Sequence, residues 1–319
     1  MRLATLSSAG RDGTLVVVSA DGARCVDASA ITPTLQDALE RWSEAETPLR
    51  ALAAGTSGWT PLDPARLRAP LPRAWQWLDG SAFDCHGELM DKVFGITVEK
   101  EGRTLMYQGV SDQFLGPNDD VPLPSADLGI DFEGEFGVIT DEVPMGTSPE
   151  DAFAHIKLIV QINDWSLRAL AGAEMKTGFG WIQAKPPCSM APFAATPDEL
   201  GDQWRGGRVC MDLRVDWNGQ RFGAANGEPM SVGFHQLVAH AARTRRLVAG
   251  TVIGSGTVSN ENYREIGSSC IAERRGIEIV DEGAARTSFM AFGDTVRMQG
   301  VTADGRSPFG VIDQKVIQA

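Results

Sequence analysis

The alternation of apolar and polar positions near the start of the chain predicts a small strand-rich unit. Residues 3–6 and 14–19 have the short apolar pattern of strands, and turn-forming residues separate them. Apolar residues at near-helical spacing then predict a broken helix over residues 35–54. The four prolines of residues 61–72 indicate a linker. We therefore expect a small N-terminal domain with its linker at residues 1–72.

The longer region, residues 73–319, alternates short apolar stretches with turn residues. Ser148 is a good N-cap for a helix over residues 149–154, because its hydroxyl can accept from a free backbone amide of the first turn. A second helix is expected over residues 232–244. Many strands with few helices indicate an α+β, β-rich domain built as an antiparallel or mixed roll. The expected strands cover residues 134–140, 157–162, 208–218, 246–253, 276–280 and 294–300.

Composition and charge narrow the classes of function. A formal net charge of -13 would repel a phosphate backbone, which argues against a nucleic-acid partner. No segment approaches the ~20 apolar residues of a membrane helix, and the first residues turn polar at once, so neither a membrane partner nor a secretory leader is expected. Five cysteines, odd in number and without CxxC spacing, favour reduced thiols in the cytoplasm over disulfides or a zinc site.

A row of acids in residues 129–138 is the clearest chemical signal. The period of a strand places Asp131, Glu133 and Glu135 on one face, where like charges repel unless they are solvated or bound to a cation. Phe132 and Phe136 on the other face indicate a core strand rather than a solvated edge. Ligands that are all oxygens favour a hard ion, Mg²⁺ or Ca²⁺, over zinc.

Two further segments carry polar side chains beside apolar strands. Asp164 ends an apolar strand and could complete a metal site, with Arg168 projecting towards the same place; it could instead cap a helix that begins near Ser166. His86 alone among the four histidines lies between acids, in a glycine-bearing stretch expected to be a loop. A carboxylate near an imidazole raises its basicity, as a general base requires.

The order and spacing of these segments resemble the fumarylacetoacetate hydrolase family. In that family an aspartate lies seven residues before the catalytic histidine, as Asp79 lies before His86. A Glu-x-Glu pair matches Glu133 and Glu135, and the aspartate of an Asn-Asp-x-Ser-x-Arg segment matches Asp164. The resemblance covers residues 73 to 319 and implies a mixed β-sandwich roll of the fumarylacetoacetase C-terminal type.

Further positions match the family segment by segment. Tyr107 lies in a Tyr-x-Gly substrate segment, and Thr257 lies in a Gly-Thr-Val-Ser segment that resembles the family's Gly-Thr-Ile-Ser. Lys185 matches the catalytic lysine loosely, and Glu273 is displaced by two residues from the glutamate that orients the histidine. Arg168 closes the Asn-Asp-x-Ser-x-Arg segment.

The resemblance implies hydrolysis of a carbon–carbon bond in a 1,3-diketo acid by a cytoplasmic homodimer. Mg²⁺ or Ca²⁺, with Mn²⁺ as an alternative, would be held by Asp79, Glu133, Glu135 and Asp164. His86 would activate water. The other matched residues are Lys185 and Arg168, which would stabilise the developing alkoxide, Glu273, which would orient the histidine, and Tyr107 and Thr257, which would bind substrate.

Other classes of function remain open at this point. The same metal-bound enolate chemistry serves a decarboxylase, an isomerase or a hydratase acting on a related 2-oxo acid. A non-catalytic binding protein with a vestigial site is a further alternative, since the lysine and glutamate matches are imperfect. A dinucleotide site at residues 250–256 is disfavoured, because the glycine spacing is not GxGxxG.

Overall fold

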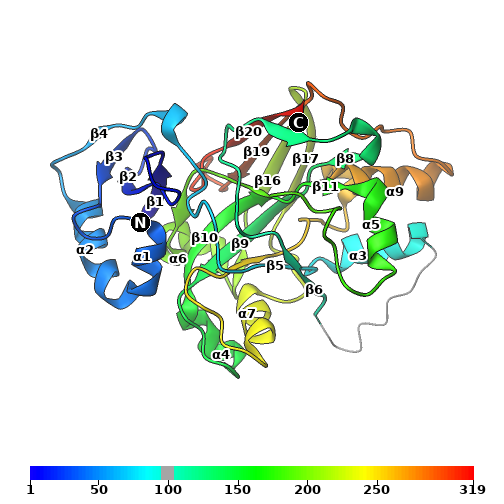
Figure 1. Cartoon of the computed structure of the whole chain (residues 1–319). Helices are drawn as coiled ribbons and strands as arrows, with labels where there is room; N and C mark the ends of the chain where they lie inside the picture. Colours follow the sequence, from blue (N-terminus) through cyan, green and yellow to red (C-terminus); the bar gives the residue numbers. More distant parts are fainter. Residues whose placement is uncertain (95–103) are drawn as a thin grey trace.

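Two β-sheets and the helices around their ends make up the computed structural model, which describes residues 1–94 and 104–319 (Figure 1). The larger sheet contains, in spatial order, β4 (Thr60–Pro61), β3 (Arg24–Asp27), β2 (Thr14–Val18), β1 (Arg2–Leu6), β13 (Ala194–Ala195), β10 (Ile156–Asn163), β9 (Gly134–Thr140), β18 (Val252–Gly254), β5 (Trp77–Gly80) and β6 (Met106–Gly109), with β12 (Ser189–Met190) paired to β10. The smaller sheet contains β17 (Gln220–Asn226), β16 (Asp212–Trp217), β19 (Thr295–Val301), β20 (Ile312–Gln318) and β7 (Val121–Leu123).

Short elements complete the fold. Two strand pairs lie outside the sheets, β8 (Ile130–Asp131) with β11 (Ser166–Leu167) and β14 (Trp204–Arg205) with β15 (Arg208–Val209). The helices are α1 (Leu35–Glu40), α2 (Trp42–Ala54), α3 (Asp84–Phe94), α4 (Pro149–Ala152), α5 (Arg168–Met175), α6 (Pro197–Leu200), α7 (Phe234–Ala242), α8 (Tyr263–Ile266) and α9 (Ile271–Glu282), and single 3₁₀ turns lie at Pro64–Arg66, Ala126–Leu128, Phe153–His155 and Gly201–Gln203.

The central strands β9 and β10 are buried on both faces because each face packs on a different core. Val138 and Ile159 lie in a core shared with the smaller sheet, whereas Ile139 and Leu158 lie in a core shared with β1, β2, α1 and α2. Such strands read as nearly continuous apolar runs, which is the pattern of residues 156–162. The α+β, strand-rich fold expected from the sequence is confirmed.

The N-terminal strands continue the larger sheet. β1 pairs antiparallel with β13, placing Leu3 opposite Ala194, and β13 in turn pairs with β10. In Figure 1 this N-terminal part lies at one end of the molecule, and α3, α5 and α9 lie at the other. The expected broken helix is also present, since α1 and α2 are separated at Arg41, whose φ of −128° is not helical.

Several other expected elements are confirmed. Ser148 caps α4 by accepting from the backbone amide of Asp151, as expected for residues 149–154. The helix expected over residues 232–244 is α7, and the strands expected over residues 134–140 and 157–162 are β9 and β10.

The strand expected over residues 276–280 is wrong, because this segment belongs to α9. Its sequence Gly-Ile-Glu-Ile-Val alternates like a strand, but the signals at its ends are helical. Cys270 Sγ accepts from the backbone amide of Glu273 at the start, and Gly283 follows the last turn with a left-handed φ of 85°.

Three further expectations need correction. The strand expected over residues 246–253 is reduced to β18, because Gly250 turns the chain with a φ of 86°. The strand expected over residues 208–218 is divided into β15 and β16. His86 lies on α3 and not in a loop. Within the described residues, the structure contains no helix long and apolar enough to cross a membrane.

Candidate active site

Three buried carboxylates lie close together, where β5 and β10 end and β9 begins. Asp79, Glu135 and Asp164 each offer an oxygen within 4.8 Å of the others, and all three side chains are buried. The sheet topology brings them together, because β5 and β9 both pair with β18 and Asp164 follows β10 directly. Gly254 of β18 leaves room for Asp79, since a Cβ there would lie 2.5 Å from Asp79 Oδ1. The same oxygen accepts from the backbone amide of Gly256 at 3.0 Å.

The chemistry of this triad fits a divalent cation. Neither side-chain oxygen of Glu135 has a hydrogen-bond donor, although both are buried. Burial, together with the charges of Asp79 and Asp164, raises the pKa of Glu135 well above its ordinary value. Burial and the charge of Asp164 likewise raise the pKa of Asp79 to about 8. Unpaired buried carboxylates are costly, and a hard cation with oxygen ligands removes that cost.

Asp164 is held from three sides. Tyr107 donates to Oδ2 at 2.6 Å, Lys185 Nζ donates to the same oxygen at 2.5 Å, and Cys188 donates to Oδ1 at 2.8 Å. A carboxylate has about four acceptor positions, so one position remains free, on Oδ1. The suggested alternative that Asp164 caps a helix is wrong, because α5 begins at Arg168 without any side-chain cap.

Glu133, the other expected metal ligand, lies outside the triad and binds cations of the chain itself. Lys185 Nζ donates to its Oε1 at 2.7 Å, and the Arg168 guanidinium lies 3.0 Å from the same oxygen. Ser166 and Thr257 also donate to this carboxylate. Burial opposes ionisation, but the charges of Arg168 and Lys185 hold the pKa of Glu133 well below its usual range. A metal contact of Glu133 therefore stays a prediction.

Asp131 does not belong to the carboxylate triad, although it lies in the same acidic stretch of the sequence. Its Oδ1 accepts from the backbone amide of Ile271 at 2.7 Å, and its Oδ2 accepts from the amide of Ala272 at 2.9 Å. Its Oδ2 also binds Arg168 Nε at 2.8 Å. The carboxylate thus satisfies the start of α9 and fixes Arg168, which in turn faces Glu133.

His86 and Glu273 form a second polar pair, between α3 and α9. His86 Nδ1 lies 3.4 Å from Glu273 Oε1, and Ser259 also donates to that oxygen. The imidazole is partly exposed, whereas the Glu273 carboxylate is buried. Ser259 and Thr257 are two residues apart in the segment that follows β18, so this segment joins the His86–Glu273 pair to Glu133.

Comparison with protein families shows to which family the chain belongs. The family model described as fumarylacetoacetate (FAA) hydrolase C-terminal matches residues 77–317, and the one described as fumarylacetoacetase N-terminal domain 2 matches residues 1–73. The chain belongs to the fumarylacetoacetate hydrolase family. The resemblance expected from the sequence is therefore confirmed.

Proteins similar to this chain carry the names of several activities. A 2,4-didehydro-3-deoxy-L-rhamnonate hydrolase of Sphingomonas sp. (strain SKA58) is 28% identical over 156 residues, which are 48% of this chain and 52% of the relative. The chain thus spans about half the length of the curated relatives it matches. A maleylpyruvate hydrolase from Sphingobium sp. SYK-6, in complex with manganese (II) ion and pyruvate, has the same fold (TM-score 0.68, 18% identity, 100% of both chains). So has a 5-carboxymethyl-2-hydroxymuconate delta-isomerase from Mycobacterium smegmatis (TM-score 0.64, 18% identity, 100% of this chain and 99% of that one).

The structure places the site residues expected from the sequence in three groups. Asp79, Glu135 and Asp164 form the triad, His86 pairs with Glu273, and the rest surround Glu133 or Asp164, namely Lys185, Arg168, Thr257 and Tyr107. Cys188 was missed. It lies three residues after Lys185, and its contact with Asp164 depends on tertiary structure that spacing does not reveal.

Replacing Lys185 by methionine is expected to lower the free energy of unfolding by about 3–5 kcal/mol, because Glu133 and Asp164 would stay buried without their shared cation. Urea unfolding of the protein in EDTA measures this change. Lys315→Met is the control, since Lys315 and its partner Asp120 are half exposed and 3.9 Å apart. Its effect is expected below about 1 kcal/mol. Equal stability of the two variants would contradict a central role for the Lys185 ion pairs.

Proposed function

We propose that this chain is a divalent-metal-dependent enzyme that hydrolyses a carbon–carbon bond in a 1,3-diketo acid of the acylpyruvate or fumarylacetoacetate type. The observation that carries the proposal is the buried triad, in which both oxygens of Glu135 lack a donor. Lys185 adjoins this triad, and the segment of Thr257 and Ser259 joins its surroundings to the His86–Glu273 pair.

The metal ligands in this proposal are Asp79, Glu135 and Asp164, with Glu133 as the fourth. A divalent cation held there would supply Lewis-acid polarisation of the substrate's carbonyl groups. Because these ligands are carboxylates alone, the proposal favours Mg²⁺, Mn²⁺ or Ca²⁺. The manganese in the maleylpyruvate hydrolase of the same fold supports this class of ion.

His86 is the general base of the proposed reaction. When Glu273 accepts from Nδ1–H, the lone pair of Nε2 is free to take a proton from water. That water adds to the acyl carbonyl, the bond between the acyl carbon and the methylene breaks, and the methylene takes a proton. The products are a carboxylate and pyruvate or acetoacetate. Glu273 and Ser259 act on this step by positioning the imidazole.

The cationic and phenolic side chains stabilise charge on the substrate. Lys185 and Arg168 both contact Glu133 Oε1 and would stabilise the oxygen that becomes negative as water adds. Tyr107, whose hydroxyl donates to Asp164 in this structure, would also contact the substrate. Thr257 would complete the substrate contacts from the segment that follows β18.

A panel of substrates tests this proposal. Acetylpyruvate, benzoylpyruvate, maleylpyruvate and fumarylacetoacetate are each incubated with Mg²⁺, Mn²⁺, Ca²⁺ or EDTA, and the cleavage products are quantified by chromatography. We expect metal-dependent cleavage of at least one substrate and none in EDTA. Conversion without cleavage would favour isomerisation, the activity named for the delta-isomerase of the same fold. Loss of carbon dioxide would favour decarboxylation, and no conversion at all would favour a binding protein.

A further inference from the structure

The segment between α5 and β12 places the indole ring of Trp181 beside the ammonium group of Lys185. The ring centroids of Trp181 and Tyr107 are 4.8 Å apart, with an interplanar angle of 82°. Lys185 Nζ lies 5.8 Å from the Trp181 centroid and 5.4 Å from the Tyr107 centroid. The ammonium therefore has two carboxylates among its contacts, Glu133 and Asp164, and two aromatic rings beside it.

Burial decreases in order from the triad to these rings. The triad carboxylates and Lys185 are buried, whereas Tyr107 and Trp181 are partly exposed. Tyr107 also touches the triad directly, through its hydroxyl on Asp164. A substrate that binds the triad and extends towards solvent on this side therefore lies against the two rings.

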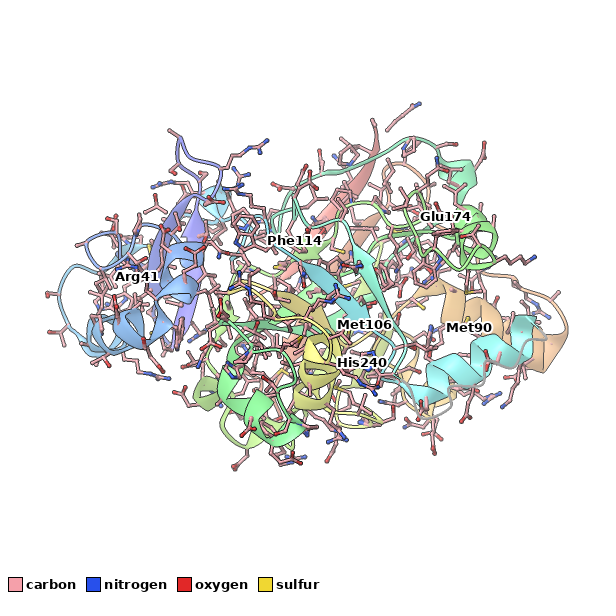
Figure 2. All side chains as sticks on the ribbon, turned by 60° about the horizontal axis from the view of Figure 1, so that its bottom comes forward. Arg41, Met90, Met106, Phe114, Glu174 and His240 are labelled. Atoms are coloured by element: carbon pink, nitrogen blue, oxygen red, sulfur yellow. The ribbon has the colours of Figure 1, made fainter. Side chains whose placement is uncertain are left out.

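Trp181 is fixed in place by the chain itself. Its indole N–H donates to the carbonyl of Ala171 in α5 at 3.1 Å. The carboxylate of Glu174 accepts the backbone amides of the three residues that follow Trp181, at distances of 2.9–3.1 Å: Ile182, Gln183 and Ala184. Figure 2 labels Glu174 at the same end of the molecule as Met90 of α3, far across the view from Arg41. A ring held in this way is in position before a ligand arrives, so little ordering opposes binding.

The charges around the rings disfavour a second anionic group on the substrate. Arg168 already contacts Asp131 and Glu133, and Lys185 already contacts Glu133 and Asp164. Among the described residues, these two side chains are the only lysine or arginine that contact the carboxylates of the site. Within the part of the chain that the structure describes, an acyl arm with its own carboxylate would thus meet further carboxylates, and the two cations of the site are already shared with acidic side chains.

We propose that Trp181 determines substrate specificity and selects acylpyruvates whose acyl arm is uncharged and planar, such as an aryl group. This inference rests on the proposed function, because it takes the triad as the place where the diketo acid binds. The planar arm stacks on the indole or meets its edge, an arrangement that stabilises aromatic pairs beyond their buried area.

The test compares kcat/KM for benzoylpyruvate, acetylpyruvate and fumarylpyruvate in the wild type and two variants, Trp181→Leu and Phe179→Leu. Phe179 lies on the same segment, two residues away, and is 97% exposed, which makes it a matched control. We expect the wild type to prefer benzoylpyruvate over fumarylpyruvate. Trp181→Leu is expected to lower the benzoylpyruvate to acetylpyruvate ratio about tenfold, mainly through KM, and Phe179→Leu is expected to leave the ratio unchanged.

The outcomes separate this inference from the proposed function. Cleavage of acetylpyruvate with an unchanged ratio in Trp181→Leu would overturn the role of Trp181 alone. So would an equal loss of the ratio in Phe179→Leu, or a wild type that prefers fumarylpyruvate. If no acylpyruvate and no fumarylacetoacetate is cleaved with any metal, the proposed function fails, and the inference fails with it. Unchanged thermal unfolding of Trp181→Leu verifies that the variant is folded.

Discussion

Replacing His86 by alanine is expected to lower turnover by about 10²–10⁴, because a positioned general base contributes about that much. The metal-induced rise in melting temperature is expected to persist, since His86 lies outside the triad of carboxylates. Turnover is measured with the substrate that the panel identifies, and melting temperatures are measured with and without Mn²⁺.

Two further variants make the role of His86 specific. His240→Ala is the control, because His240 is exposed on α7 and labelled on that helix in Figure 2. Glu273→Gln keeps a side chain of the same size near Nδ1, so we expect a smaller loss of turnover than in His86→Ala. If His86→Ala keeps most of its turnover, the base is another group.

Replacing Glu135 by glutamine is expected to abolish metal-induced stabilisation and to reduce turnover by on the order of 10³ or more, because metal polarisation of the substrate contributes several kcal/mol. In EDTA the same variant is expected to be more stable than the wild type, since one of three mutually repelling buried carboxylates is removed. Melting temperatures with EDTA and with saturating Mn²⁺ measure both effects. At 100 times its Kd, a metal stabilises by about 2.7 kcal/mol, which is readily detected.

Glu133→Gln and Glu142→Gln are informative comparisons for this variant. Glu133 binds Lys185 and Arg168, so its replacement is expected to lower stability in EDTA, opposite in sign to Glu135→Gln. Glu142 is exposed and paired with exposed Arg246, so its replacement is expected to change little. An undiminished response of Glu135→Gln to Mn²⁺ would place the metal elsewhere.

Local signals in the sequence predicted an element correctly where its hydrophobic period and its end signals indicated the same type of structure. The apolar run of β10 and the cap at Ser148 predicted their elements correctly, because strand period and capping are local properties. The strand predicted for residues 276–280 was wrong because it also rested on a local pattern, since Gly-Ile-Glu-Ile-Val alternates like a strand. What makes them helical is Cys270 and Gly283 at the ends of α9 and its packing on α3, where Gly276 meets Met90.

The candidate site was less accessible to sequence reasoning, because its groups are joined by strand order. Spacing within one strand suggested that Asp131, Glu133 and Glu135 act together, but each has different partners in the structure. Asp79 reaches Glu135 only because β5 and β9 lie on opposite sides of β18, and a parallel pair such as β5 and β18 leaves no local signal. Trp181 and Cys188 lie outside the strands, and they were missed because their contacts with Tyr107 and Asp164 depend on how the segment between α5 and β12 folds onto the site.

The continuity of β1 with the strands that carry the carboxylates has a practical consequence for shortened versions of this chain. Removing residues 1–72 would free the edge of β13, which is two residues long, and would uncover the apolar face that carries Leu158, Val160 and Ile162. An unprotected edge beside an apolar face is a template for pairing between chains, so the fragment is prone to aggregate. Insolubility of such a fragment would therefore reflect the exposed strand edge and apolar face. It would not show that the N-terminal region takes part in catalysis.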